Sequence, residues 1–343
     1  MKPICHINLA RGYRGGERQT ELLIRELARL GWAQRLLARA GEPLSKRLQD
    51  IPALEIIEAR KPYFRHVPAL RNTIAHAHEA RATKLAYLGA RLFSTPYVIT
   101  RRLGKRPGNN PLTRAIYRDA GVIVAVARSV AQGLREYAQR DDIAVVHSAV
   151  SRLTADPQIS DGLRARWPGR FLVVNVAALV HSQKGQRHLI QVARRMVQAR
   201  PDIHFLLLGD GKDREWLEAE ARGLPNISFE GFIDNPGDYL AAADLFVLPS
   251  LHEGIGGACL DAFDFGLPVI ACAVDGVPEV VTDEVNGLLI PPADEQALFA
   301  AICRVHDDPA LAARLGNAGR AAVTAFYPER MADQYMQIYA ALD

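Results

Sequence analysis

Short apolar runs alternate with longer amphipathic stretches along the whole chain. The apolar runs predict strands at 4–9, 34–38, 54–59, 73–78, 97–101, 122–127 and 143–146, then at 171–178, 204–209, 227–230, 245–249, 268–272 and 287–290. Helical spacing of apolar residues predicts helices at 15–30, 80–93, 129–138, 185–200, 213–222, 237–243, 257–265 and 295–306. Strands that alternate with helices predict parallel sheets covered on both faces.

The alternation pauses once, which suggests two domains. Residues 151–169 contain two prolines and two glycines and are the expected linker. Charge changes sign at the same place. Of 42 Lys and Arg and 38 Asp and Glu in the chain, residues 1–150 hold 26 and 12, a net of +14, while residues 151–343 hold 16 and 26, a net of −10. A length of 343 residues also fits two domains, and we expect them at 1–155 and 156–325.

Composition narrows the class of protein. A hydrophobic content of 49% with 23% charged residues excludes global disorder. Apolar runs fall short of the roughly 18 residues of a membrane span, and the N-terminal run is too short for a signal peptide, so we expect a cytoplasmic protein. The four cysteines are far apart and lie in apolar runs, which favours buried free thiols over zinc or disulfide roles. An aromatic content of 7% without a recognition module argues against a nucleic-acid partner.

Two glycine-rich turns follow predicted strands and open helices, where backbone amides and the helix N-terminus favour a phosphate. The first runs from Gly12 to Glu17 and includes Gly15 and Gly16, but its spacing does not match the dinucleotide fingerprint. An ordinary strand-to-helix turn is the alternative there. The second consists of Glu253, Gly254, Ile255, Gly256, Gly257 and Ala258, with Asp261 further along the helix. Its two carboxylates suit hydroxyl groups of a sugar and a ribose, and solvated acids near a capped helix are the alternative.

Lys184 precedes Gly185 at the start of another predicted helix. Helix N-termini favour anions, so a Lys there fits best when a phosphate ligand binds beside it. The alternative is a solvated Lys in a turn.

These motifs resemble, in order and spacing, the retaining glycosyltransferases of the GT-B fold, family 4 (group 1 type). The resemblance is carried by residues 253–261, by Gly266-Leu267-Pro268 and Gly276-Val277-Pro278-Glu279, by Leu207-Leu208-Gly209-Asp210-Gly211, Gly231-Phe232 and Asn286-Gly287, and by Gly15-Gly16-Glu17 and Lys184-Gly185. It covers nearly the whole chain and is most specific over 204–292. It implies two Rossmann-like doubly wound domains facing a cleft, with residues 326–343 forming a helix that crosses back to the first domain.

The resemblance also implies roles for residues. Glu253 would hydrogen-bond the donor sugar, Asp261 would hold the ribose, and the base would lie near Phe232 and Ile233. Amides at Gly16 and around residues 254–258 would hold the diphosphate, with Lys184 as the counter-charge. Glu253 and Lys184 would thereby act in catalysis.

The sequence departs from the family pattern at three places. Asp261 replaces a usual glutamate. Ala178 replaces a phosphate-binding arginine, for which Arg187 or Arg102 could compensate. Thr100-Arg101-Arg102 replace the histidine that the family often has after the fifth strand of the first domain. Arginine pairs of this kind occur in family members that modify lipopolysaccharide or other glycolipids.

A retaining, metal-independent transfer is the expected chemistry, with no cofactor besides the nucleotide-sugar. The chain contains no Asp-x-Asp motif that would clamp a metal ion on the diphosphate. Retention in this family is expected through front-face attack, assisted by the leaving phosphate. The expected donor is a UDP-sugar, with ADP- and GDP-sugars as open alternatives. The expected acceptor is a glycolipid, lipopolysaccharide core or surface polysaccharide.

The first half offers acceptor-side candidates. His78 ends a predicted strand and is either a cleft residue or a buried structural histidine. His76 shares the same strand face, but a metal site at these two histidines would need a further ligand that the sequence does not indicate. The basic residues Arg101, Arg102, Lys105, Arg106, Arg114 and Arg118 form either a solvated face or a contact for acceptor phosphates or an anionic membrane.

Two other functions share the predicted scaffold, namely a sugar-nucleotide epimerase and a non-catalytic sugar-nucleotide-binding protein.

Overall fold

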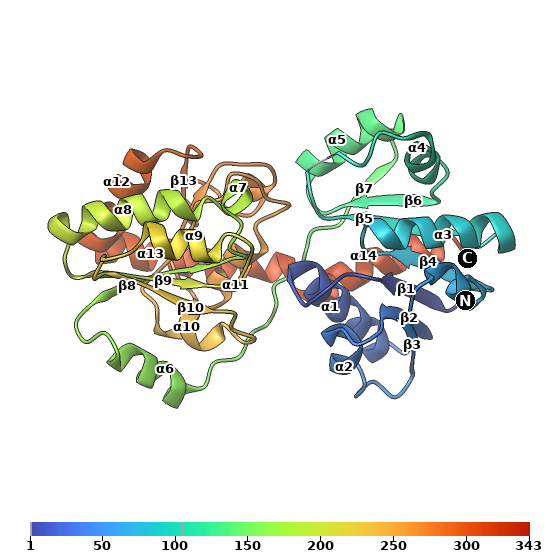
Figure 1. Cartoon of the computed structure of the whole chain (residues 1–343), viewed down its shortest axis with the longest axis horizontal. Helices are drawn as coiled ribbons and strands as arrows, with labels where there is room; N and C mark the ends of the chain where they lie inside the picture. The colour runs from blue at the N-terminus through green and yellow to red at the C-terminus, as the bar shows by residue number, and fades with distance from the viewer. Residues whose placement is uncertain (1, 105) are drawn as a thin grey trace. The chain divides into compact units, whose positions relative to one another are not determined.

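Two parallel β-sheets organise the chain, each in its own compact unit (Figure 1). The computed structural model describes residues 2–104 and 106–343. The first unit comprises Met1–Ser151 and Phe326–Asp343, and the second comprises Arg152–Ala325. The chain thus enters the second unit once and returns for its last helix.

The first unit contains a seven-stranded sheet in the order β3-β2-β1-β4-β5-β6-β7, with parallel neighbours throughout. The order reverses between β1 and β4, which lie side by side. The strands are β1 (Ile4–Asn8), β2 (Gln34–Arg39), β3 (Leu54–Ala59), β4 (Ile74–Ala77), β5 (Tyr97–Arg101), β6 (Val122–Ala125) and β7 (Ile143–Val145). The helices are α1 (Gly15–Arg29), α2 (Pro43–Arg47), η1 (Tyr63–Leu70), α3 (Ala80–Phe93), α4 (Pro111–Arg118), α5 (Arg128–Ala138) and α14 (Pro328–Ala340).

Helix α14, drawn in red near the blue N-terminal elements, packs within the first unit (Figure 1). Met331, Tyr335 and Tyr339 are buried in a core shared with Leu23 and Leu27 of α1. The amphipathic spacing of these residues therefore buries one face of the last helix against the first sheet and α1.

The second unit contains a six-stranded parallel sheet in the order β10-β9-β8-β11-β12-β13. Its order reverses between β8 and β11. The strands are β8 (Phe171–Val176), β9 (Ile203–Leu208), β10 (Ile227–Gly231), β11 (Leu245–Leu248), β12 (Val269–Cys272) and β13 (Leu288–Ile290). The helices are α6 (Pro157–Ala165), α7 (His181–Lys184), α8 (Gln186–Ala199), α9 (Arg214–Glu220), α10 (Gly237–Ala242), α11 (Gly257–Asp264), η2 (Val277–Glu279), α12 (Glu295–Asp307) and α13 (Pro309–Ala322), and η3 (Val323–Phe326) follows.

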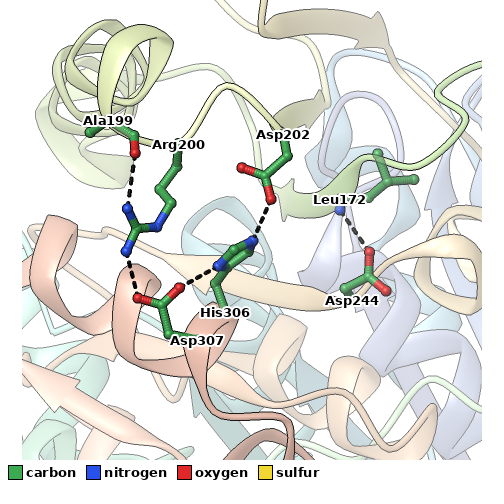
Figure 2. A network of polar contacts seen from close by, with 7 residues as sticks. All are labelled: Leu172, Ala199, Arg200, Asp202, Asp244, His306 and Asp307. Carbon is green, nitrogen blue, oxygen red and sulfur yellow. Dashed lines mark hydrogen bonds and ion pairs between the residues drawn. The ribbon is translucent and has the colours of Figure 1, made fainter.

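Charged side chains tie helix ends to the start of β9 in the second unit (Figure 2). The imidazole of His306, on α12, lies between two carboxylates, with Nδ1 at 2.7 Å from Asp307 and Nε2 at 2.7 Å from Asp202. Arg200, just after α8, donates to Asp307 at 2.6 Å. The ends of α8 and α12 are therefore fixed to each other and to the residue that precedes β9.

The α/β class and every expected strand are confirmed, with small differences at the strand ends. The expectation of a linker over 151–169 needs correction, because α6 occupies residues 157–165 and packs against α10. Pro157 stands at the first helical position, where its missing N–H costs nothing, and Asp156 caps the helix by accepting from the amide of Gln158 at 2.8 Å.

Candidate functional site

The sheet of the second unit reverses its strand order between β8 and β11, and ligands of such sheets bind at the carboxyl ends of the strands beside this reversal. Lys184 ends α7, in the connection that follows β8, and Glu253 lies in the loop that follows β11. Lys184 Nζ and Glu253 Oε1 form an ion pair, with side chains 22% and 10% exposed. Ser250 Oγ donates to the same carboxylate oxygen at 2.8 Å. The two predicted catalytic side chains are therefore in direct contact.

Backbone contacts hold the two loops together. Gly185 has φ +65°, and a Cβ atom there would lie 2.0 Å from the carbonyl oxygen of Pro249, so only glycine allows this approach. The amides of Leu251 and His252 both donate to the carbonyl oxygen of Gln183, at 2.8 and 3.0 Å. The turn that carries Lys184 and the loop that carries Glu253 thus form one rigid corner.

Helix α11 begins directly after this corner. Gly256 is its N-cap residue with φ +73°, and a Cβ atom there would lie 3.1 Å from the side chain of Val277. The first turn of α11 carries no acidic residue and no side-chain cap. The positive end of the helix dipole and the Lys184 ammonium therefore lie beside one loop, an arrangement that favours an anionic ligand.

Beneath this loop the thiol of Cys259 is buried in the first turn of α11. Burial raises the pKa of Cys259 well above its usual value, and the carboxylate of Glu253 adds to this shift. Burial and a raised pKa both disfavour the exposed thiolate that a cysteine nucleophile needs.

The other predicted donor residues of the second unit lie along the same edge of the sheet. Gly254, Ile255 and Gly256 are buried. Gly257 and Ala258 begin α11, and Asp261 follows on that helix. Phe232 and Ile233 follow β10, and Phe232 is 58% exposed. Three strand spacings separate β10 from β11, or about 14 Å, which is enough room for an extended ligand with an aromatic group at one end and an anion at the other.

Gly15 and Gly16 open α1 in the first unit, as expected from their turn. The Lys184–Glu253 corner is built entirely from residues of the second unit.

Sequence reasoning did not single out three groups of this corner. Ser250 and the carbonyl of Gln183 were missed, as was Asp275, whose Oδ2 accepts from the amide of Glu253 at 2.7 Å. Ser250 directly follows a predicted strand and could have been considered on that ground. The contact with Asp275 joins loops after two different strands, and no local pattern indicates it.

Three buried histidines form a polar core in the first unit. His6 on β1 and His76 on β4 are register partners, and the residue after β4 is His78. One ring nitrogen from each of the three lies within 4.8 Å of those of the other two. The histidine that sequence reasoning missed is His6, and the pairing of the first strand with β4 brings it beside the other two.

Hydrogen bonds give these histidines defined partners. Gln34 donates its amide to the carbonyl of Ile24, so its oxygen accepts from His6 Nε2 at 3.0 Å. His6 Nδ1 then accepts from His78 Nε2 at 2.9 Å, and His78 Nδ1 faces Arg102 Nη2 at 3.3 Å. The orientation of this chain from Arg102 to Gln34 follows from the side-chain amide at its end.

His76 is held separately, by the Tyr339 hydroxyl at 2.6 Å and Thr100 Oγ1 at 2.7 Å. Every ring nitrogen of the three histidines thus has a protein partner. Burial lowers the pKa of His6 to about 3 and lowers the pKa values of His76 and His78 as well. The cluster is a neutral hydrogen-bonded core that anchors α14 and Arg102, and a metal ion would have to displace these partners.

The predicted basic cluster is largely engaged in local contacts. Arg106 pairs with Glu136, Arg118 pairs with Asp119 at 2.8 Å, and Arg114 donates to Asn109 at 2.6 and 2.9 Å. Arg102 also donates to the carbonyl of His78 at 2.9 Å. Arg101 ends β5 and is half-buried, and Lys105 lies outside the described residues.

Two glycosyltransferase family profiles match the chain, one for each unit. Residues 13–152 match Glycosyltransferase Family 4, and residues 170–308 match Glycosyl transferases group 1. The chain belongs to this glycosyltransferase family. The family resemblance seen in the sequence motifs is therefore confirmed.

Curated relatives span almost the full length of this glycosyltransferase. The lipopolysaccharide core biosynthesis glycosyltransferase LpsD of Rhizobium meliloti is 29% identical, covering 98% of this chain and 97% of its own. LpsE of the same organism, which carries the same description, is 26% identical over 95% and 96%.

Solved structures share the fold of the glycosyltransferase. Anabaena Alr3699/HepE, crystallised with UDP and glucose, superposes with a TM-score of 0.86 at 18% identity and covers 99% of this chain and 100% of its own. Sucrose-phosphate synthase from Thermosynechococcus elongatus gives a TM-score of 0.81 at 23% identity, with 100% and 99% coverage. The two-sheet architecture is therefore that of GT-B glycosyltransferases.

Proposed function

We propose that this glycosyltransferase moves a sugar from a UDP-sugar to a glycolipid, lipopolysaccharide-core or surface-polysaccharide acceptor, with retention of anomeric configuration and without a metal ion. The proposed binding of a nucleotide-sugar donor rests on the Lys184–Glu253 contact. This contact lies beside the N-terminus of α11, at the strand reversal of the second sheet. The related HepE was crystallised with UDP and glucose and with UDP-glucose, which supports the choice of donor.

Each group at this corner fits one part of a nucleotide-sugar. The Lys184 ammonium and the N-terminus of α11 would stabilise the diphosphate as it leaves, since both are fixed before reaction. Glu253 offers a carboxylate that accepts hydrogen bonds from sugar hydroxyls, and Asp261 offers another for the ribose. Phe232, exposed after β10, offers a face on which a base stacks.

In the proposed reaction the bond between the anomeric carbon and the phosphate oxygen breaks, and the acceptor oxygen bonds to the same face of that carbon. The proton of the acceptor hydroxyl passes to the leaving phosphate oxygen. The transition state has oxocarbenium character, as in other glycosyl transfers. Lys184 balances the charge on the leaving group, so the absence of an arginine at Ala178 places more of this task on Lys184.

The acceptor part rests on charge and on the relatives. Residues 326–343 belong to the first unit and contain one basic residue, Arg330, and three acidic residues. The first unit therefore has a formal charge of +12, and the second has −8. LpsD and LpsE are named for lipopolysaccharide core biosynthesis. We therefore assign an anionic acceptor to the first unit, and place the enzyme at the cytoplasmic face of an anionic membrane.

One exposed segment of the first unit suits such a surface. Residues 60–71 contain four basic and no acidic residues. Arg60, Lys61 and Arg65 are exposed, and among the described residues they have no ion-pair partner. Phe64 between them is 61% exposed. We call residues 60–65 the basic segment, and it combines free positive charge with an apolar side chain.

No helix formed by the described residues has the length and apolar character to cross a membrane.

The donor assignment is tested by sugar transfer with Lys184→Ala and Glu253→Ala. Each should lower kcat/KM by about a hundredfold, because each removes a fixed charge from the reacting centre. Arg194→Ala is the matched control, since it removes an exposed cation from α8 of the same unit. Unchanged transfer in both site variants, with folding verified by circular dichroism, would overturn the assignment. A product that forms without any acceptor would indicate an epimerase instead.

A further inference from the structure

Asp275 has a left-handed backbone conformation and one close side-chain contact. It follows β12 with φ +46°, in the left-handed region where glycine is preferred. Its side chain is 31% exposed, and Oδ2 accepts a hydrogen bond from the amide of Glu253 at 2.7 Å. His252 Nδ1 lies 3.8 Å from the same oxygen. Asp and Asn adopt this region more readily than most residues with side chains, so the observation that points to a specific task is the hydrogen bond from the Glu253 amide to the Asp275 carboxylate.

That contact completes the anchoring of the Glu253 loop. Three successive amides are held, those of Leu251 and His252 by the carbonyl of Gln183 and that of Glu253 by Asp275. The first two contacts fix the loop to the Lys184 turn. The third is the only one of the three made by a side chain, and it fixes the residue whose carboxylate faces Lys184 and Ser250.

We propose that Asp275 is a positioning residue that sets the Glu253 carboxylate for the donor sugar. The proposal rests on the donor-sugar role given to Glu253 under the proposed function. Asp275 holds the main chain of Glu253, and Lys184 and Ser250 hold its side chain, so loss of the Asp275 contact releases the backbone and spreads the carboxylate over several positions. The nucleotide is bound by other groups, so UDP affinity does not depend on Asp275.

Two substitutions separate the hydrogen bond from the backbone conformation. Asp275→Gly removes the acceptor and relieves the left-handed strain, so the variant stays folded. Asp275→Asn keeps an acceptor oxygen and tolerates the same φ. We expect Asp275→Gly to lower kcat/KM for UDP-glucose transfer by about tenfold, the value of one hydrogen bond to a charged group, and Asp275→Asn to stay within about threefold of the wild type.

Ala293→Gly is the matched control. Ala293 also has a left-handed backbone, with φ +59°, and lies after β13 in the same unit. It should leave kcat/KM unchanged. UDP affinity, measured by calorimetry, should be the same in all these proteins. A parallel loss of UDP affinity in Asp275→Gly, or an Asn variant as poor as the Gly variant, would overturn the positioning role.

A double-mutant cycle with Glu253→Gln identifies the residue through which Asp275 acts. Once Glu253 has lost its charge, Asp275→Gly should change kcat/KM by less than about twofold. A full additional loss would show that Asp275 acts elsewhere and would overturn the proposal. If Glu253→Gln alone transfers sugar like the wild type, the donor-sugar role itself is wrong. If Glu253→Gln is impaired and Asp275→Gly is not, only the positioning role is wrong.

Discussion

At position 185 a missing Cβ atom allows two loops to meet. The carbonyl oxygen of Pro249 occupies the space that a side chain at Gly185 would need, 2.0 Å from the ideal Cβ position. The Lys184 turn therefore approaches the end of β11 closely enough for the ion pair with Glu253. A backbone atom cannot move aside as a flexible side chain does, so the corner depends on this single residue type.

We predict that Gly185→Ala lowers the free energy of unfolding by about 2–4 kcal/mol, because it combines backbone strain with a backbone clash. Gly169→Ala is the matched control. Gly169 has φ +71° with nothing within 4 Å of an added Cβ, so its loss should be about 1 kcal/mol, from strain alone. Urea denaturation of both variants measures the difference, and equal losses would contradict the role given to the close approach.

Residues of the corner were predictable to different degrees. Lys184 and Glu253 follow predicted strands and stand next to glycine turns, so local pattern and family motif both indicated them. Asp275 and the carbonyl of Gln183 act through contacts between loops that follow different strands. Such contacts depend on strand order in the sheet, which alternation of apolar runs does not specify.

At the scale of elements, three helices that the pattern missed begin with the same short sequence. α4, α6 and α13 each have Pro at the first helical position and Asn or Asp as the N-cap, with the side chain accepting from a first-turn amide. Over residues 151–169 the prolines indicated a linker, and the helices at 111–118 and 309–322 were not predicted. Proline is equally a helix-start signal when Asn or Asp precedes it. This is the physical reason why the three helices were not predicted.

The charged clamp at the end of α12 predicts a pH dependence of stability (Figure 2). Burial alone would lower the pKa of His306, but its hydrogen bonds to Asp307 and Asp202 raise that pKa above its usual value. A raised folded-state pKa gives a stabilisation that is complete below the unfolded-state pKa and is lost as pH rises through the folded-state pKa. The clamp should therefore contribute fully below about pH 6.5, the ordinary pKa of a histidine, and progressively less as the pH rises above it.

The measurement compares unfolding free energies of the wild type and His306→Gln below and above about pH 6.5. The difference between the two proteins should shrink as pH rises. His66→Gln is the control, because His66 contacts the backbone of Arg60 and no carboxylate. A difference that stays constant with pH, or grows, would show that His306 is not charged in the clamp.

At the scale of the whole molecule, the two units carry opposite formal charges. The second unit carries −8, so its proposed diphosphate site must rely on local groups such as Lys184 and the α11 N-terminus and not on net charge. The first unit carries +12 and has the exposed basic segment. The sequence alone indicated this division, because charge and apolar pattern changed at the same place in the chain.

We predict that the enzyme binds anionic liposomes more strongly than neutral ones at low salt, and that salt removes the difference. Reversing Arg60, Lys61 and Arg65 to Glu should weaken this binding by at least about tenfold, because each basic residue near an anionic surface contributes about 1 kcal/mol. Reversing the exposed residues Arg194, Lys212 and Arg222 of the second unit controls for net charge. Co-sedimentation measures both. Equal binding to the two kinds of liposome would contradict membrane association, and equal losses in the two triple variants would contradict the basic segment.

The central claim is a nucleotide-sugar site built on Lys184 and Glu253, and ligand-induced stabilisation tests it most directly. Melting temperatures of the wild type and of Lys184→Ala are measured with UDP-, ADP- and GDP-sugars. A ligand at a hundredfold excess over its Kd stabilises the folded state by about 2.7 kcal/mol. The account predicts a clear rise for the wild type with a UDP-sugar and a much smaller one for Lys184→Ala. No rise with any nucleotide-sugar, or an equal rise in both proteins, would contradict it.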